Sequence, residues 1–313
     1  MPRSATLPAL ACLAPLGAVL IWSGNMTINQ LTVGTIAPST IAFLRWVLAL
    51  LVLTPIVLPK AWRERDAIFR AWPKLAVLGL LGMALWQGLA YMAAETTSAT
   101  NMGILAAMVP LLTVLLSALI LRETPTWGGV VGGCLALVGV LWLLSRGHFS
   151  ALAELEVATG DFLMIIAAIC YALYGVMLKR WPLDLSPWVM LYVQAVFATL
   201  LLLPGYLLGP MTPINSTNAG LILYAGIPAS IITTYLWMMA IRHLGASRSS
   251  IFINLMPVFS ALIAMLLLGE RLAWYHLSGG LLVLSGVLMA QLLTRPLKRS
   301  RVQPLQDSRT TAR

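Results

Sequence analysis

Charged side chains are scarce in this chain of 313 residues: 10% are Asp, Glu, Lys or Arg, while 60% are hydrophobic. Soluble domains carry about 25% charged residues, so water is a poor solvent for most of this surface. The run 104–121 contains no charge, and about 18 such residues suffice for a helix to cross the hydrocarbon core of a bilayer. The composition therefore excludes an ordinary soluble fold and predicts an integral membrane protein.

Cysteine and histidine are also scarce, with three of each. All three cysteines fall inside apolar segments, which favours small buried hydrophobes over a disulfide framework. The histidines are separated and form no HExxH motif or Cys/His cluster, so we expect no metal site and no cofactor.

Carboxylates are absent from the interiors of the apolar runs. The aspartates lie in loops or at the edges of these runs: Asp66, Asp161, Asp184 and Asp307. A membrane-embedded enzyme acting on lipid or peptide needs a nucleophile with its base, or paired aspartates, within the bilayer. A proton relay also needs buried ionisable groups, and a channel needs a polar filter or a charged ring. We therefore expect a transporter, keep the enzyme as the alternative, and expect no proton relay.

About ten apolar segments of spanning length follow one another, which predicts an all-α membrane protein. The first begins at Leu7 and has no small-residue cleavage site after it, so we interpret it as a span and not as a signal peptide. The predicted spans are 8–29, 38–58, 75–94, 100–121, 127–144, 161–178, 187–208, 218–240, 249–268 and 275–293.

The basic residues predict the orientation. With a cytoplasmic N-terminus, only Arg146 and Arg271 fall in outer loops, Arg45 lies within a span, and all other lysines and arginines face the cytoplasm. Because inner loops are enriched in positive charge, both termini are predicted to be cytoplasmic. The basic residues form no stripe with interleaved aromatic side chains, so we expect no nucleic-acid partner.

The two halves of the sequence match each other. A shift of 147 residues aligns Pro110 with Pro257 and Glu123 with Glu270, without a gap over about fifty residues. Five spans per half place the halves in opposite directions across the membrane, an arrangement used by many secondary transporters. We predict a first repeat (8–144), an outer linker (145–160), a second repeat (161–293) and a basic cytoplasmic tail (294–313). A duplication that only builds a stable bundle is the alternative.

The doubled pattern resembles the EamA domain of the drug/metabolite transporter superfamily, ten-helix type. The residues that carry the resemblance are Pro110, Leu121-Arg122-Glu123, Gly132-Gly133 and Gly139-Val140, their partners Pro257, Leu268-Gly269-Glu270, Gly279-Gly280 and Gly286-Val287, and also Ile21–Asn25 and Phe43–Arg45. The resemblance covers about residues 10–293. It implies export of amino acids, related metabolites or other amphiphilic solutes and drugs across the bacterial inner membrane. The first span lacks the buried glutamate of the small multidrug pumps, which argues against proton-coupled export of cationic drugs.

Arg45 is the one ionisable residue well inside a predicted span. A charge in hydrocarbon costs about 2.5–3.5 kcal/mol on insertion scales, so such residues often mark function. Trp22, Asn25 and Asn29 share one helix face by their spacing. We hypothesise that this face and Arg45 form the polar wall of a cavity that attracts an anionic group. An architectural role for Arg45 is the alternative, and the resemblance supports it.

Further polar and aromatic residues complete the predicted cavity, since aromatic side chains supply both contact area and hydrogen-bond donors. They are Gln87, Tyr91, Tyr171, Tyr174, Gln194, Tyr235, Trp237 and Asn254. Trp86 and Trp142 are interpreted as packing residues. The expected partners are a small-molecule substrate and membrane lipid, with a monomer favoured over a homodimer.

Two pairs of repeated residues predict moving parts. Pro110 and Pro257 each remove a backbone donor within a span and predict kinks or hinges. Glu123 and Glu270 end helices, where a carboxylate is unfavourable to the helix dipole. They therefore predict a partner such as Arg122 or Arg271, or a gate contact. Gly128–Gly133 contains two GxxxG patterns, which predict close helix packing between the halves or between protomers.

Overall fold

The protein is a bundle of helices in a computed structural model that describes residues 6–154, 158–268 and 273–297. Eight helices of this part are long and apolar enough to cross a membrane, and the shorter apolar helices Cys12–Met26 and Gly128–Leu144 accompany them. The described residues form no β-strand beyond an isolated bridge between Thr126 and Pro296. The predicted all-α membrane fold is confirmed.

The first half supplies these elements: α1 (Thr6–Thr32), α2 (Pro38–Arg63), α3 (Arg65–Gly79) with η1 (Leu80–Leu85) and α4 (Trp86–Ala94), α5 (Ala99–Ala107) with α6 (Val109–Ile120), and η2 (Gly128–Gly132) with α7 (Gly133–Leu144). After η3 (Phe149–Glu154), the second half supplies α8 (Thr159–Arg180), α9 (Pro187–Leu208), α10 (Ser216–Gly226) with η4 (Ile227–Ile232) and α11 (Thr233–Leu244), α12 (Ala246–Ser250) with η5 (Ile251–Leu255) and α13 (Met256–Leu268), and α14 (Trp274–Leu292). The third span starts at Arg65 and not near residue 75, because the basic residues of α3 are good helix formers and extend the helix beyond its apolar part.

The two halves share irregular helical turns at equivalent positions. The π-helical turns η1 and η4 are related by the same shift of 147 residues. The fourth span is broken at Met108, between α5 and α6, and the ninth span passes through the 3₁₀ turn η5. Pro110 and Pro257 are each the second residue of the helix that follows, where a missing N–H costs little. The two prolines therefore follow breaks in their spans.

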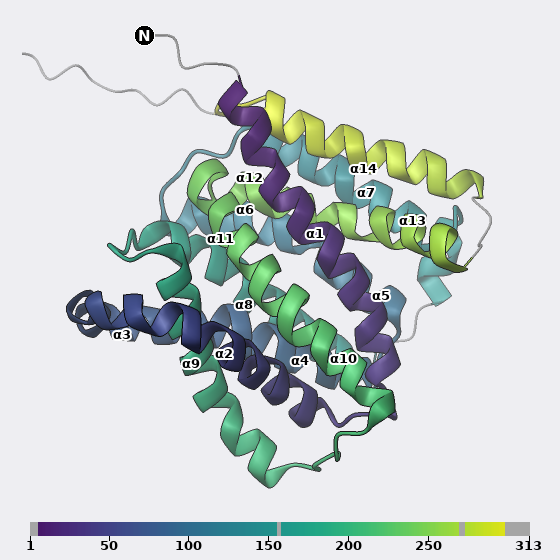
Figure 1. Ribbon diagram of the computed structural model, residues 1–313. Helices are drawn as coiled ribbons and strands as arrows, with labels where there is room; N and C mark the ends of the chain where they lie inside the picture. The colour runs from purple at the N-terminus through teal and green to yellow at the C-terminus, as the bar shows by residue number, and fades with distance from the viewer. Residues whose placement is uncertain (1–5, 155–157, 269–272, 298–313) are drawn as a thin grey trace, which may run out of the picture.

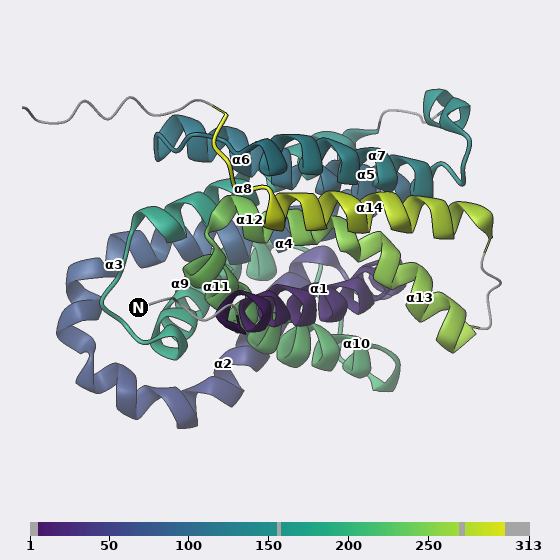
Figure 2. The ribbon, with the colours of Figure 1, turned by 90° about the horizontal axis from the view of Figure 1, so that it is seen from above.

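Most close helix contacts join one half to the other. The pairs are α1 with α11, α2 with α9, α4 with α8, and α7 with α14. Figures 1 and 2 show α7 and α14 running side by side along one edge of the bundle. The core is thus shared between the two halves, so neither half buries its apolar faces alone.

Glycines let α7 and α14 approach backbone to backbone. A Cβ added at Gly132 would lie 2.4 Å from the carbonyl oxygen of Gly286, and one at Gly286 would lie 2.4 Å from the oxygen of Gly132. A Cβ added at Gly139 would likewise clash with the carbonyl oxygen of Gly279, and one at Gly128 with the carbonyl oxygen of Met289. The small-residue surface predicted on the fifth span packs the two halves together, as in other close helix pairs of membranes.

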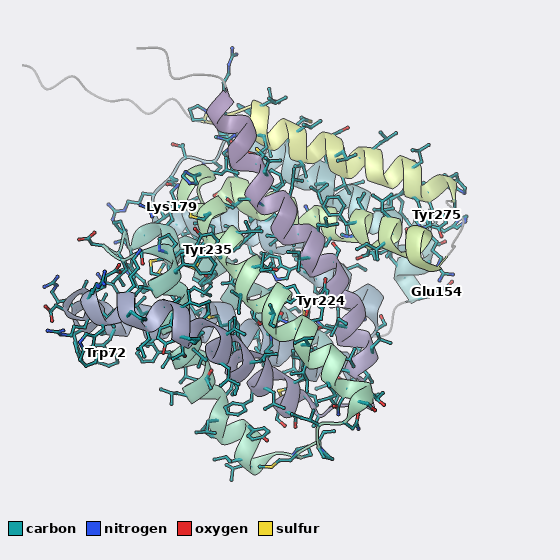
Figure 3. All side chains as sticks on the ribbon, in the orientation of Figure 1. Trp72, Glu154, Lys179, Tyr224, Tyr235 and Tyr275 are labelled. Atoms are coloured by element: carbon teal, nitrogen blue, oxygen red, sulfur yellow. The ribbon has the colours of Figure 1, made fainter. Side chains whose placement is uncertain are left out.

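The bundle has two opposite ends, which we name by their residues. Figure 3 places Lys179 and Trp72 toward one end and Glu154 and Tyr275 toward the other. The Lys179 face contains the ends of α2, α6, α8 and α11 and the starts of α3, α9 and α12. The Asp161 face contains the ends of α4 and α7 and the starts of α5, α8 and α14.

Candidate functional site

A cavity lies in the core between the two halves. Its volume is about 30 Å³, room for about two water molecules. The first half contributes α1, α4 and α5, and the second contributes α8 with the region around η5. Its lining is Trp22, Asn25, Met26, Asn29, Trp86, Gln87, Ala90, Met102, Ala106, Met164, Tyr171, Ile253 and Met256. A metabolite does not fit into this volume, so the cavity must widen to hold one.

Polar groups of the cavity have unused hydrogen-bonding capacity. Asn25 donates from Nδ2 to Asn29 Oδ1 over 3.2 Å. Asn25 Oδ1, Gln87 Nε2 and Tyr171 OH are buried and have no hydrogen-bond partner among the described residues. Buried polar atoms in proteins are nearly always paired. Together these three atoms offer a solute a hydrogen-bond acceptor, a donor and a hydroxyl group. Among the described residues, no charged side chain lines the cavity.

Aromatic rings close the cavity on the side of α8 and α11. The ring of Tyr171 lies 4.7 Å from Trp86 and 5.7 Å from Trp22, and Trp22 lies 5.1 Å from Trp237. Tyr171 also contacts Tyr174 at 5.7 Å and Trp237 at 6.1 Å. Trp237 and Tyr174 are almost fully buried. These rings form an aromatic layer, which we define as Trp22, Trp86, Tyr171, Tyr174 and Trp237.

Five residues predicted for the cavity therefore line it: Trp22, Asn25, Asn29, Gln87 and Tyr171. Tyr174 and Trp237 lie in the aromatic layer next to them. Sequence reasoning missed Trp86, which it interpreted as packing, and the methionines Met26, Met102, Met164 and Met256. Methionine adapts its shape readily and suits a site that must change volume. No spacing in the sequence separates Trp86 from a packing tryptophan, and methionines look the same in a core and in a cavity.

Other predicted residues lie elsewhere. Tyr235 stacks on Trp188 with ring centroids 4.0 Å apart, outside the cavity. Asn254 belongs to η5 beside the lining residue Ile253, and both polar atoms of its buried side chain have no described partner. Gln194 on α9 is fully buried and equally unpaired among the described residues. Asn254, Gln194 and Tyr235 therefore do not belong to the cavity lining, and Asn254 only follows a lining residue in the sequence.

Arg45 is buried at a junction of three helices and not in the lining of the cavity. Its side chain is 1% exposed. Nε donates to Ser230 Oγ of η4 over 2.8 Å, and Nη1 donates to Tyr91 OH of α4 over 3.1 Å. The guanidinium carbon also lies 5.9 Å from the ring centroid of Tyr91. Arg45 thereby connects α2 to two spans that contain π-helical turns, a geometry that favours its architectural alternative. Tyr91, predicted for the cavity, lies at this junction and not in the cavity lining.

We expect Arg45→Ala to destabilise the protein and to lower transport of all solutes by the same factor. Tyr91 would lose its buried partner, and a lost charged hydrogen bond in the interior costs about 2–4 kcal/mol. The measurement is the melting temperature in detergent together with uptake normalised to folded protein. Arg63→Ala, at the exposed end of α2, is the control. A selective loss for anionic solutes would instead support the cavity role.

A carboxylate connects the halves at each face. On the Lys179 face, Glu123 after α6 forms an ion pair with Lys179 at the end of α8. The partner is therefore not Arg122, which adopts φ 55° and ends the helix. On the Asp161 face, Asn101 Nδ2 of α5 donates to both oxygens of Asp161 over 3.1 Å, and Thr97 donates to the same carboxylate. Glu270 and Arg271 lie outside the described residues. We call these contacts the Glu123 latch and the Asp161 latch.

Comparisons with known proteins agree with this architecture. The EamA-like transporter family matches residues 9–145 and again residues 158–292. This chain is 27% identical to YyaM, an uncharacterized transporter of Bacillus subtilis (strain 168). The match covers 88% of this chain and 91% of the length of YyaM. A probable terminal-alkyne amino-acid exporter of Streptantibioticus cattleyicolor is 27% identical over 75% of this chain and 78% of its own. A solved crystal structure matches with a TM-score of 0.72 over 91% of this chain and 98% of that chain. At 21% identity it supports the fold alone.

Proposed function

Since the chain belongs to the EamA-like transporter family, we propose that it exports amino acids or related small amphiphilic metabolites by alternating access. Family membership confirms the predicted transporter over the membrane-embedded enzyme. The observation that carries the more specific proposal is the cavity between the two halves, which is uncharged and lined by amide and aromatic groups. A solute with an apolar body and few hydrogen-bonding groups complements such a lining.

The orientation that we propose assigns the two faces to the entry and exit of an exported solute. The described lysines and arginines outside the interior gather on the Lys179 face, for example Arg63, Arg65, Lys74, Arg180 and Arg242, whereas Arg146 ends α7 on the Asp161 face. The positive-inside rule assigns the Lys179 face to the cytoplasm of a bacterial inner membrane. Solute would then enter past the Glu123 latch and leave past the Asp161 latch.

Alternating access requires that one latch opens while the other stays closed. The breaks before Pro110 and Pro257 lie in spans next to the cavity and supply places where α6 and α13 can tilt. The lining residues Met102 and Ala106 precede the first break, Ile253 lies within the second, and Met256 directly follows it. A tilt at either break would widen the cavity, which the small resting volume requires.

Purified protein in liposomes tests the proposal. A panel of amino acids and related metabolites is loaded inside, and release is followed with the wild type and with Gln87→Leu. This change removes the unpaired donor at nearly constant size, and we expect at least a tenfold loss of release. The control is Thr217→Val, at an exposed residue near the start of α10. Gln291→Leu is unsuitable as a control because Gln291 accepts a hydrogen bond from Arg248. Absence of release for the whole panel would count against export of this solute class.

Energy coupling is tested in the same liposomes. Because the sequence predicts no carboxylate deep in a span, we expect that dissipating the proton gradient leaves the initial rate of release unchanged. The measurement compares rates with and without a protonophore at a fixed solute gradient. Accumulation driven by an imposed pH gradient would contradict the expectation.

A further inference from the structure

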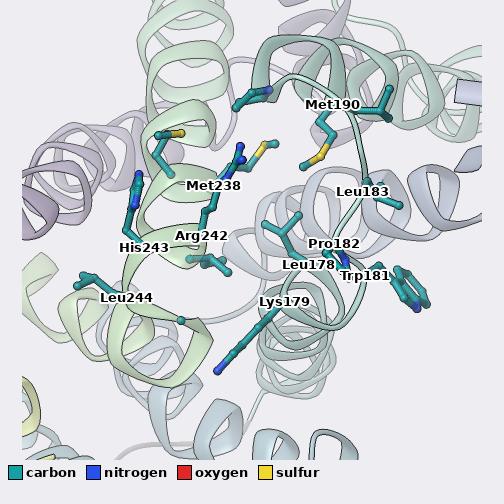
Figure 4. A pocket seen from close by; sticks show the side chains of 15 residues that line it. Leu178, Lys179, Trp181, Pro182, Leu183, Met190, Met238, Arg242, His243 and Leu244 are labelled. Carbon is teal, nitrogen blue, oxygen red and sulfur yellow. The ribbon is translucent and has the colours of Figure 1, made fainter. Parts of the chain in front are cut away.

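A second cavity opens on the Lys179 face. It has a volume of about 450 Å³ and lies between the end of α8, the segment 181–187, the start of α9 and the end of α11. Figure 4 shows Arg242 and Met238 reaching into it from α11, with Met190 on the opposite side from α9. This volume is large enough for a small metabolite, unlike that of the central cavity.

The lining of this second cavity, which we call the vestibule, combines apolar and cationic groups. Met190, Met238 and Leu183 supply apolar surface, and Lys179, Arg242 and His243 supply the basic groups. No acidic residue belongs to the described lining. Arg242 and His243 are exposed, and neither forms an ion pair within the described part of the chain. A ligand that fits this surface has an anionic group attached to an apolar body.

The vestibule and the central cavity share helix α8. On α8, Tyr171 lines the central cavity, Tyr174 belongs to the aromatic layer, and Leu178 lines the vestibule. These residues share one helix face at spacings of three and four. On α11, Trp237 of the aromatic layer directly precedes Met238 of the vestibule. The aromatic layer therefore separates two cavities that follow each other along one path.

We propose that this vestibule is a loading site that binds the anionic group of an amphiphilic carboxylate before it passes the aromatic layer. The proposal rests on the proposed export function and specifies its substrate class: amphiphiles that carry a carboxylate. Arg242 pairs with the carboxylate, while Met190 and Met238 contact the apolar body. Because the central cavity has no described charged group, recognition of the anion takes place at the vestibule.

Lys179 connects this site to the Glu123 latch. It lines the vestibule and at the same time pairs with Glu123, and the two side chains are 36% and 40% exposed. Ion pairs this exposed are weak, so an anion bound next to Arg242 competes with Glu123 for Lys179. Binding of the solute would thereby loosen the contact that holds α6 of the first half to α8 of the second.

Octanoate is a suitable probe, with octylamine and octanol as controls of equal chain length. Met239 lines the vestibule, so the Met239→Cys variant reports occupancy through protection from a thiol reagent, quantified at that residue by mass spectrometry. In detergent-solubilised full-length protein we expect octanoate to slow the labelling and the two controls not to. Arg242→Gln should weaken protection at least tenfold, whereas Arg180→Gln, an exposed neighbour outside the lining, should preserve it.

A substitution in the Glu123 latch should change octanoate protection in the opposite direction. Glu123→Gln removes the competitor for Lys179, so it should strengthen octanoate protection severalfold. Equal protection by all three probes, an equal loss in Arg242→Gln and Arg180→Gln, or weaker protection in Glu123→Gln would each overturn the proposal. Displacement of octanoate by phosphatidylglycerol in mixed micelles, but not by phosphatidylcholine, would assign the site to a lipid headgroup and also overturn it.

Failure of this proposal is distinguishable from failure of export. Protection is measured without transport, so octanoate binding in a protein that releases no solute would retain the vestibule and reject export. Conversely, release of carboxylate and neutral solutes that Arg242→Gln lowers by the same factor would retain export and reject the loading site.

Discussion

Gly132→Leu is expected to prevent assembly of the two halves, leaving little monodisperse protein after extraction in detergent. The Cβ alone would lie 2.4 Å from the carbonyl oxygen of Gly286 and 2.9 Å from the backbone nitrogen of Ala290. These are backbone atoms, so no side chain can rotate away to make room. Forcing extra atoms into a tight interior costs about 1–3 kcal/mol even where neighbours yield, and here α7 and α14 must separate along their length.

The matched substitutions define the expected order. Gly132→Ala and Gly286→Ala should each lower the melting temperature, with Gly132→Leu the most severe. Gly220→Ala on α10 is the control, because a Cβ there meets nothing within 4 Å. It should change the melting temperature little or raise it, since alanine favours helices by about 1 kcal/mol over glycine. Normal yield and melting temperature for Gly132→Leu would show that α7 and α14 do not pack at this distance.

The spans and the two related halves can be predicted from the sequence. Hydropathy predicts the spans because a helix in lipid must be apolar along its whole length. The repeat predicts two related halves because aligned Pro and Gly positions constrain the backbone directly. The π-helical turns η1 and η4 were not predicted, since no residue type marks a change in hydrogen-bond register.

The site was predicted less completely than the fold. Spacing placed Trp22, Asn25 and Asn29 on one face, and all three line the cavity. Depth along the span suggested Arg45 as well, but depth does not reveal which way a side chain points. Arg45 instead finds partners on η4 and α4, which depend on how distant helices cross.

The latches lay beyond sequence reasoning for a similar reason. The sequence predicts a partner for Glu123 and offers the neighbouring Arg122 as a candidate. The left-handed turn at Arg122 ends the helix, and the partner comes from α8 of the other half. Asp161 was interpreted only as a residue at the edge of a span. Its partners Thr97 and Asn101 are distant in sequence, and no pattern announces a contact between them.

Asp161→Ala is expected to open the Asp161 face and to shift the access equilibrium by about tenfold to several hundredfold. The carboxylate accepts from Thr97 and Asn101 across the halves and from the backbone N–H of Ala158 over 2.8 Å. Hydrogen bonds to a charged group contribute about 1.5–3 kcal/mol each, and each 1.4 kcal/mol is a factor of ten in the equilibrium. Hydration of the freed groups offsets part of this free energy, and this offset sets the lower end of the range.

The measurement is labelling of a cysteine introduced at Met164, which lies one turn from Asp161 on α8 and lines the cavity. A reagent that does not cross membranes, added at the Asp161 face, should react much faster in the Asp161→Ala background, while Glu123→Gln should slow it by favouring the opposite opening. Glu95→Gln, an exposed carboxylate on the same face, controls for a change in local charge. Asp161→Asn retains one acceptor and should fall between the wild type and Asp161→Ala. If labelling rises equally in Glu95→Gln, or if Asp161 and Glu123 variants change it in the same direction, the two carboxylates do not act as opposed latches.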